Sequence, residues 1–253
     1  MSGHSKWANR VHRKTRQDTK RSKVFTKLSR ALMVAAREGG ANPVDNPSLR
    51  SLMDQARAAQ LPSDTIEYAI KRGAGQVEGI QFEAVRYEGY GPGGVAMLIE
   101  CVTDNTQRTV AEVRSILSKR AGKRGGAGSV RWMFEQKGVI TVPRADVDYE
   151  DVFLAAAEAG AEDFADDDPC YIEIRTALED FQAVRDALTA AGIPVERAEL
   201  SMLPASTVAV PDNEAGKLLR LFDDLDDHDD VQHVYANFEV SDDALASYEV
   251  ANA

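Results

Sequence analysis

The chain has 253 residues, 43% of them hydrophobic, which is enough to bury a sizeable core in two or three compact units rather than one. Its longest apolar stretch, residues 94–102, is interrupted by Glu100 and is far shorter than the roughly 18 residues that cross a bilayer, so no transmembrane helix is predicted. The two cysteines, Cys101 and Cys170, allow neither a disulfide framework nor a paired-cysteine metal site, and they favour a reducing, cytoplasmic compartment. The net charge is −11, but the charged residues are distributed unevenly along the chain.

The chain begins with a strongly basic segment. Asp18 is the one acidic residue among the first 30, and residues 1–75 carry 15 basic and 6 acidic side chains against 15 and 35 in residues 76–253. A basic end attracts polyanions, and the acidic remainder restricts how they approach. A solvated tail and an organellar transit peptide are the alternatives on charge alone.

Three helices follow this leader. Apolar residues at helical spacing predict helices over 22–38, 48–60 and 64–72, separated by Gly39-Gly40 and by a loop that contains Pro43 and Pro47. Short loops between three helices predict one small helical domain over residues 1–78.

Strands and helices alternate after residue 79. Strands are predicted over 82–89 and 94–102, joined by a glycine-rich turn, and a helix capped by residues 103–105 ends near Gly122. Two strands, 130–134 and 139–142, flank a Gln-Lys-Gly turn. The remaining predicted elements are a helix over 149–160, a strand over 171–176, a helix containing Phe181 and Leu188, strands over 195–203 and 207–210, a helix containing Leu218 and Leu225, and an alternating strand over 234–240.

This alternation predicts sheets with helices packed on one face, and the number of strands is natural for two such units. Residues 143–203 can be an insertion in a unit built from 80–135 and 206–240. Contiguous halves would give a similar pattern, so the residues alone leave the nesting open.

Several long motifs then resemble the YebC/PmpR family in order along the chain. They include MSGHSKWAN at residues 1–9, FTKL at 25–28, AIKRG at 69–73, YEGYGPGG at 87–94 and RTVAEVR at 108–114. The resemblance extends to about Val240. In the region 119–131, relatives usually have a nearly uncharged loop, whereas this chain has five basic residues.

The resemblance implies an α+β protein with an N-terminal helical bundle and two ferredoxin-like α/β domains, one inserted in the other. The expected boundaries are 1–78 for the basic helical domain, 79–135 with 205–240 for the discontinuous domain, 136–204 for the inserted domain, and 241–253 for a C-terminal tail. Bacterial relatives are described as cytoplasmic DNA-binding transcriptional regulators, while mitochondrial and some bacterial members act in translation. The resemblance also removes the transit-peptide interpretation.

Basic residues without a base-reading pattern are suited to the phosphate backbone, because Lys and Arg release condensed counterions whatever the sequence. The predicted nucleic-acid-binding residues are Lys6, Arg10, Arg13, Lys14, Arg16, Lys20, Arg21, Lys23, Lys27 and Arg30, with Lys119, Arg120, Lys123 and Arg124 as a second group. DNA is the favoured partner, and ribosomal RNA is the alternative. Trp7 can stack on a base or pack the leader against the bundle.

No enzyme is predicted. His4 and His12 lack a carboxylate partner, the glycine-rich stretches lack the ending of a phosphate-binding loop, and the acidic runs at 162–168 and 223–230 lack the pattern of a calcium loop. We therefore expect no cofactor, no metal, no small-molecule substrate and no membrane partner. The acidic runs are expected to be solvated, to repel phosphate and to suit a basic protein surface.

Overall fold

The computed structural model describes residues 21–145, 147–166 and 168–251. Its first part is a bundle of three helices, α2 (Arg21–Gly39), α3 (Pro47–Ala58) and α4 (Ser63–Gly73), in which α2 contacts both of the others. The Asn46 side chain caps α3 by accepting from the backbone N–H of Leu49, and its amide donates to the carbonyls of Ala35 and Gly40 at the end of α2. One side chain therefore joins two helices around a core that contains Leu32, Leu49 and Ile66.

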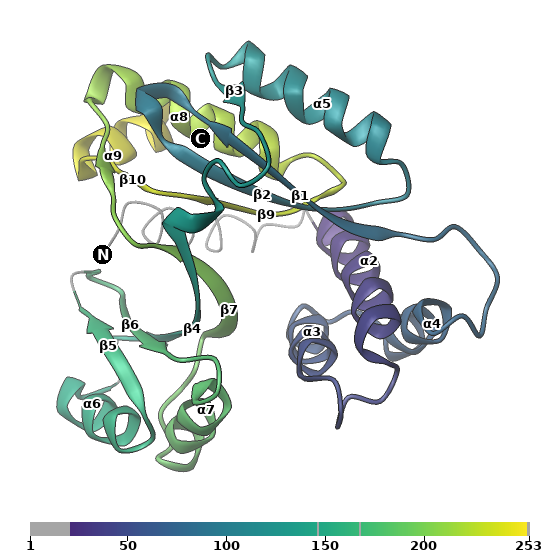
Figure 1. Ribbon diagram of the computed structural model, residues 1–253. Helices are drawn as coiled ribbons and strands as arrows, with labels where there is room; N and C mark the ends of the chain where they lie inside the picture. Colours follow the sequence, from purple (N-terminus) through teal and green to yellow (C-terminus); the bar gives the residue numbers. More distant parts are fainter. Residues whose placement is uncertain (1–20, 146, 167, 252–253) are drawn as a thin grey trace.

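A first antiparallel sheet has the strand order β3-β1-β2-β9. Its helices lie on one face and bury an apolar cluster that includes Met97, Ile99 and Leu218 (Figure 1). The strands are β1 (Glu83–Tyr90), β2 (Ala96–Thr103), β3 (Lys123–Arg124) and β9 (Val231–Ala236); the helices are α5 (Thr106–Lys119) and α8 (Asp212–Asp226).

A second antiparallel sheet is built from residues 134–204, which lie between β3 and β8 (Val208–Ala209) in the chain. Its order β5-β6-β4-β7 and its sequence of elements, βαββαβ, are those of a ferredoxin-like unit. The elements are β4 (Phe134–Pro143), α6 (Tyr149–Glu158), β5 (Ala161–Ala165), β6 (Tyr171–Thr176), α7 (Phe181–Ala190) and β7 (Arg197–Pro204). Helices α6 and α7 bury one face around Ile140, Ile174 and Leu188.

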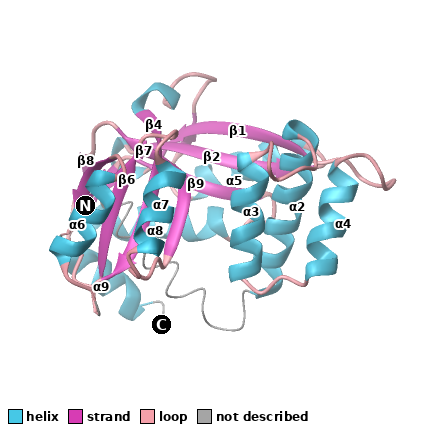
Figure 2. Cartoon of the chain, turned by 90° about the horizontal axis from the view of Figure 1, so that it is seen from below, coloured by secondary structure: helices cyan, strands magenta, loops and turns pink. Residues whose placement is uncertain are grey.

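The two sheet units are nested, because β9 pairs with β2 only after the second sheet has been completed. This confirms the predicted α+β class with a helical bundle and two α/β units, one inserted in the other; the four boundaries named above stay predictions. Figure 2 shows the three bundle helices gathered at one end of the molecule and the inserted unit toward the other. The uncovered faces of both sheets and helices α2 and α3 line one cleft of about 940 Å³.

One predicted turn is a continuous strand. The sequence predicts two strands around residues 136–138, but β4 runs through Gly138 without a break and pairs there with both β6 and β7. A Cβ atom at Gly138 would lie 2.3 Å from the Thr176 hydroxyl oxygen and 2.5 Å from the Phe181 ring. This glycine is therefore needed for close approach of neighbouring side chains and not for a turn.

The C-terminal region also differs from expectation. The alternating segment 234–240 is divided at the buried Asn237: β9 ends before it, and β10 (Phe238–Glu239) pairs with β8 (Val208–Ala209) in a separate parallel ribbon. The Asn237 side chain accepts from the backbone N–H of Ala96, which fixes this change of sheet. The predicted tail contains helix α9 (Asp242–Ala251), whose Leu245 and Tyr248 are buried in the core of the first sheet.

Candidate nucleic-acid interface

The predicted binding residues fall into three sets. Lys6, Arg10, Arg13, Lys14, Arg16 and Lys20 lie outside the described residues, as do His4, Trp7, His12 and the side chain of Arg21. Lys23, Lys27 and Arg30 lie on α2, and Lys119, Arg120, Lys123 and Arg124 lie at the end of α5 and on β3. The two described sets have different surroundings.

The cations of α2 face acidic residues of the same chain. Lys23, Lys27 and Arg30 share one face of the helix, because residues three and four apart are neighbours on a helical surface. They lie 3.3 Å from Asp227, 3.3 Å from Asp226 and 2.8 Å from Asp230, respectively. The same three cations donate to the carbonyl oxygens of residues 227, 226 and 229, where the negative end of the α8 dipole also favours positive charge.

These contacts change the expected role of the α2 cations. The acidic run 223–230, expected to be solvated, supplies an internal partner surface at the end of α8 and in the loop that follows it. Phosphate would have to compete with this surface for Lys23, Lys27 and Arg30. Their assignment as phosphate ligands therefore stays a prediction that requires displacement of an existing ion pair.

Asp230 is the centre of this contact. Its side chain is only 3% exposed, and its carboxylate accepts hydrogen bonds from Arg30 at 2.8 Å, Arg108 at 2.7 Å, and the hydroxyls of Thr109 at 2.8 Å and Thr103 at 3.2 Å. Burial by itself would raise the pKa of Asp230, but the hydrogen bonds from Arg108 and Thr109, with the charges of Arg108 and Arg30, outweigh it and lower the pKa. The aspartate is thus held ionised between the bundle and the first sheet.

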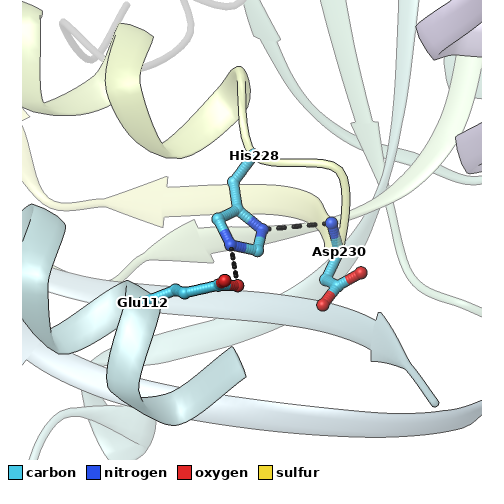
Figure 3. Close-up of side chains that lie close together, drawn as sticks. All are labelled: Glu112, His228 and Asp230. Carbon is cyan, nitrogen blue, oxygen red and sulfur yellow. Dashed lines mark hydrogen bonds and ion pairs between the residues drawn. The ribbon is translucent and has the colours of Figure 1, made fainter. Parts of the chain in front are cut away.

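Asp230 also belongs to a group of three potential metal ligands, with Glu112 and His228. Figure 3 shows His228 between the Glu112 carboxylate and the backbone nitrogen of Asp230. Because the Asp230 N–H donates to Nδ1 at 3.1 Å, the proton of a neutral His228 ring lies on Nε2 and faces Glu112 at 2.9 Å. Each ring nitrogen is therefore engaged, and the Asp230 carboxylate is engaged by two guanidinium groups, so we interpret the cluster as a structural network.

The second basic set is more accessible. Lys119, Lys123 and Arg124 are exposed, and none of the three forms an ion pair with an acid in the described part of the chain, whereas Arg120 pairs with Asp224 on α8 at 2.7 Å. The pKa of Arg120 is raised by its hydrogen bond to Asp224 and by the charge of that residue. Three of these four cations remain available to an external anion.

Glu88 on β1 fixes the loop that follows these residues. Its buried carboxylate accepts from the backbone N–H groups of Gly128 and Val130, both at 2.6 Å, and of Arg131 at 3.0 Å. Burial would raise the pKa of Glu88, but these backbone hydrogen bonds outweigh it and lower the pKa. The loop is therefore tied to the sheet by a charged side chain.

The cleft between the two sheets is a less suitable place for a phosphate backbone. Each of the four cations that line it is already in an ion pair: Lys23 and Lys27 with α8, Arg86 with Glu100 at 2.6 Å, and Arg197 with Glu199 at 3.6 Å. Additional acidic groups line the same walls, including the buried Glu173. The cleft has no surplus of positive charge for a polyanion.

Sequence reasoning missed Arg108, Asp230 and Glu88, the residues that organise these contacts. Their partners are separated by 40 to 200 residues in the chain, so no local spacing identifies them. The sequence contains one general signal for this contact, because a basic helix and an acidic helix end in the same chain carry complementary charges.

Comparisons with known proteins cover nearly the whole chain. Residues 5–76 match a family model described as the TACO1/YebC protein N-terminal domain, and residues 82–238 match one described as the TACO1/YebC second and third domain. Among curated relatives, proteins named probable transcriptional regulatory protein are 54% identical in Kosmotoga olearia (96% of each chain covered) and 51% identical in Geobacter sulfurreducens (95% of this chain, 97% of that one). The crystal structure of a conserved hypothetical protein from Aquifex aeolicus is similar with a TM-score of 0.82 at 44% identity, covering 89% of this chain and 93% of that chain.

Proposed function

The chain belongs to the TACO1/YebC family, and from this premise we propose that it is a cytoplasmic transcriptional regulator that binds the phosphate backbone of DNA. The leader cations at positions 6–20 and the exposed cations Lys119, Lys123 and Arg124 are the proposed contacts. The names of the curated relatives support the regulatory role. No catalytic step, cofactor or membrane partner is part of the proposal; no helix within the described residues has the length and apolarity needed to span a bilayer.

The uneven charge distribution is the observation that carries the proposal. Residues 1–75 have nine more basic than acidic side chains, although the whole chain has a net charge of −11. Three of these cations pair with acidic residues at the end of α8 and in the loop after it, so the expected interface moves toward the leader and the α5–β3 region. Acidic surfaces elsewhere limit binding to these places by repulsion.

Salt-dependent binding to duplex DNA tests the proposal. The affinity should fall steeply with salt, with a slope of about 0.9 for each phosphate contacted. The variant Lys14→Gln/Arg16→Gln should bind more weakly and lower the slope by about two contacts. Arg57→Gln/Lys71→Gln is the matched control, because it removes the same charge from two exposed intrahelical pairs of the bundle. Equal binding by both variants, or a shallow slope for the unmodified chain, would contradict the proposal.

A ribosome-associated translation factor is the second candidate function. One observation favours it: α6 exposes Tyr149, Phe153 and Leu154 beside the acidic residues Glu150 and Asp151, a combination suited to a basic, partly apolar protein surface such as ribosomal proteins present. The basic end would then contact ribosomal RNA. Sedimentation with ribosomes from actively translating cells tests this function, and absence from the ribosomal fractions would exclude it.

A further inference from the structure

Trp132 is a large aromatic side chain placed on the surface between β3 and β4. It is 74% exposed, and it lies in the short helix η3 (Arg131–Met133). Its indole Nε1 donates to the carbonyl oxygen of Ser129 at 3.2 Å, and the Tyr90 hydroxyl donates to the same oxygen at 3.3 Å. One carbonyl therefore brings the tryptophan next to an aromatic residue at the end of β1.

Lys123 is an exposed cation beside Tyr90. In the register of β1 with β3, Tyr90 is opposite Lys123, so both side chains leave the sheet on the same face, whereas Arg124 is opposite Gly89 and its side chain leaves β3 on the other face. The Lys123 Nζ lies 5.8 Å from the centroid of the Tyr90 ring, which keeps this ammonium group near the aromatic residues. Lys123 also lines a hollow of about 460 Å³ with Glu214 and Lys217 from α8. An exposed indole and an exposed ammonium group thus both lie beside Tyr90.

This arrangement is held in place before any ligand binds. Glu88 accepts from the amides of Val130 and Arg131, directly before the tryptophan, and its own carbonyl accepts from the N–H of Gly125, directly after β3. The two ends of the loop are therefore attached to a single residue of β1. A fixed loop loses little conformational entropy when it binds a partner.

We propose that Trp132 and Lys123 form a binding site for single-stranded nucleic acid, in which the indole stacks on an unpaired base and the Lys123 ammonium group contacts an adjacent phosphate. The inference rests on the proposed function and specifies the form of nucleic acid that this surface binds. Stacking requires the open face of a base, which a duplex hides between its neighbours. The exposed ammonium group of Lys123 beside Tyr90 favours a nucleic acid over an apolar protein segment as the occupant.

Fluorescence of Trp132 tests the site directly. The chain has two tryptophans, so Trp7→Phe leaves Trp132 as the one indole reporter. Titration of this variant with ten-nucleotide oligo(dT) and oligo(U) should quench the emission, and a ten-base-pair duplex should quench it much less. Preference for oligo(U) would identify RNA as the natural source of the strand, and equal affinity would show that the sugar is not distinguished; both results support the site.

Substitutions separate stacking from charge. Trp7→Phe/Trp132→Leu has no tryptophan, so its affinity is measured by the fluorescence anisotropy of a labelled oligonucleotide. It should bind about 5- to 150-fold more weakly, the range expected for loss of one stacked base. Trp7→Phe/Phe153→Leu is the matched control, since it replaces an exposed aromatic residue on α6 and should leave the affinity unchanged. Lys123→Gln should lower the salt slope by about 0.7, the value for one lost phosphate contact on a single strand. Circular dichroism of each variant confirms that the fold is retained.

The outcomes distinguish the site from the proposed function. Salt-dependent binding of nucleic acid without quenching of Trp132, or with equal quenching by duplex, would overturn the site and leave the function standing. Failure of the unmodified chain to bind any nucleic acid would overturn both. The result we expect is quenching of Trp132 by single strands, with weaker binding of a labelled oligonucleotide by the Trp132→Leu variant and unchanged binding by the Phe153→Leu variant.

Discussion

Replacing Asp230 with asparagine should destabilise the protein by about 2–3 kcal/mol. Breaking a buried ion pair from one side typically costs 3–5 kcal/mol, because the remaining charge stays behind without its partner. Here the side chains left behind, Arg108 and Arg30, are 41% and 20% exposed and can turn partly to water, which reduces that cost. The amide of asparagine would also place a donor against guanidinium and hydroxyl donors.

Urea denaturation followed by circular dichroism measures this effect against a matched variant. Asp224→Asn removes the same charge from another Asp–Arg pair, with Arg120 at 2.7 Å, but both of its side chains are more than a third exposed. Solvent screens that pair, so it should contribute much less to stability than the contacts of Asp230. If Asp230→Asn cost no more than Asp224→Asn, the interpretation of Asp230 as the central buried contact would be wrong.

The same carboxylate predicts a dependence of stability on pH. Because its pKa is lower in the folded chain than in the unfolded one, Asp230 contributes its full stabilisation above the unfolded value of about 3.9. This contribution is lost as the pH falls from there through the lower folded value. The stability difference between the unmodified chain and Asp230→Asn should therefore shrink below about pH 4.

Two further predictions concern the packing of the chain. Burial, with the nearby charges of Asp230 and Glu100, raises the pKa of the Cys101 thiol to about 12. A maleimide should therefore label the exposed Cys170 in the native protein and Cys101 only after unfolding, which mass spectrometry of the peptides would show. Gly73→Ala should cost about 1–3 kcal/mol, because its Cβ would lie 2.1 Å from a backbone oxygen of α2, whereas Gly126→Ala meets open space and should change the urea midpoint little.

The helices were the most predictable part of the fold. The expected ranges 22–38, 48–60 and 64–72 end within two residues of α2, α3 and α4, because apolar spacing, a capping asparagine and prolines act locally. Strand β5 was missed, because its sequence, AEDFA, has the composition of a solvated acidic run. Its acids instead pair with cations of the same sheet, Asp163 with Arg175 on the adjacent β6 and Glu162 with Lys137 on β4, two strands away.

The residue types of the candidate site could be predicted from the sequence, but their arrangement in space could be predicted much less well. Positive charge at positions 23, 27 and 30 was identified correctly, but its partners are about 200 residues further along the chain. Complementary charge determines that contact, and many acidic segments of this sequence could have supplied it. The cations at positions 119, 120, 123 and 124 are predicted from the sequence to bind an anion, and this stays a prediction. No pattern in the sequence predicts that the Trp132 indole lies at the surface, hydrogen-bonded to the same carbonyl as Tyr90.

The late pairing of β9 with β2 has a consequence for synthesis of the protein. The inserted unit has all four of its strands once residue 204 has been made, while the surrounding sheet lacks β9 until residue 236 has been added. A ribosome releases the chain from its N-terminal end. The inserted unit can therefore fold before the surrounding sheet, although β1 and β2 of that sheet are synthesised first. Until then β2, a strand of mostly apolar residues, has one edge without a neighbour, and a delay in elongation over the last 50 residues would prolong the interval in which that edge can pair with another chain.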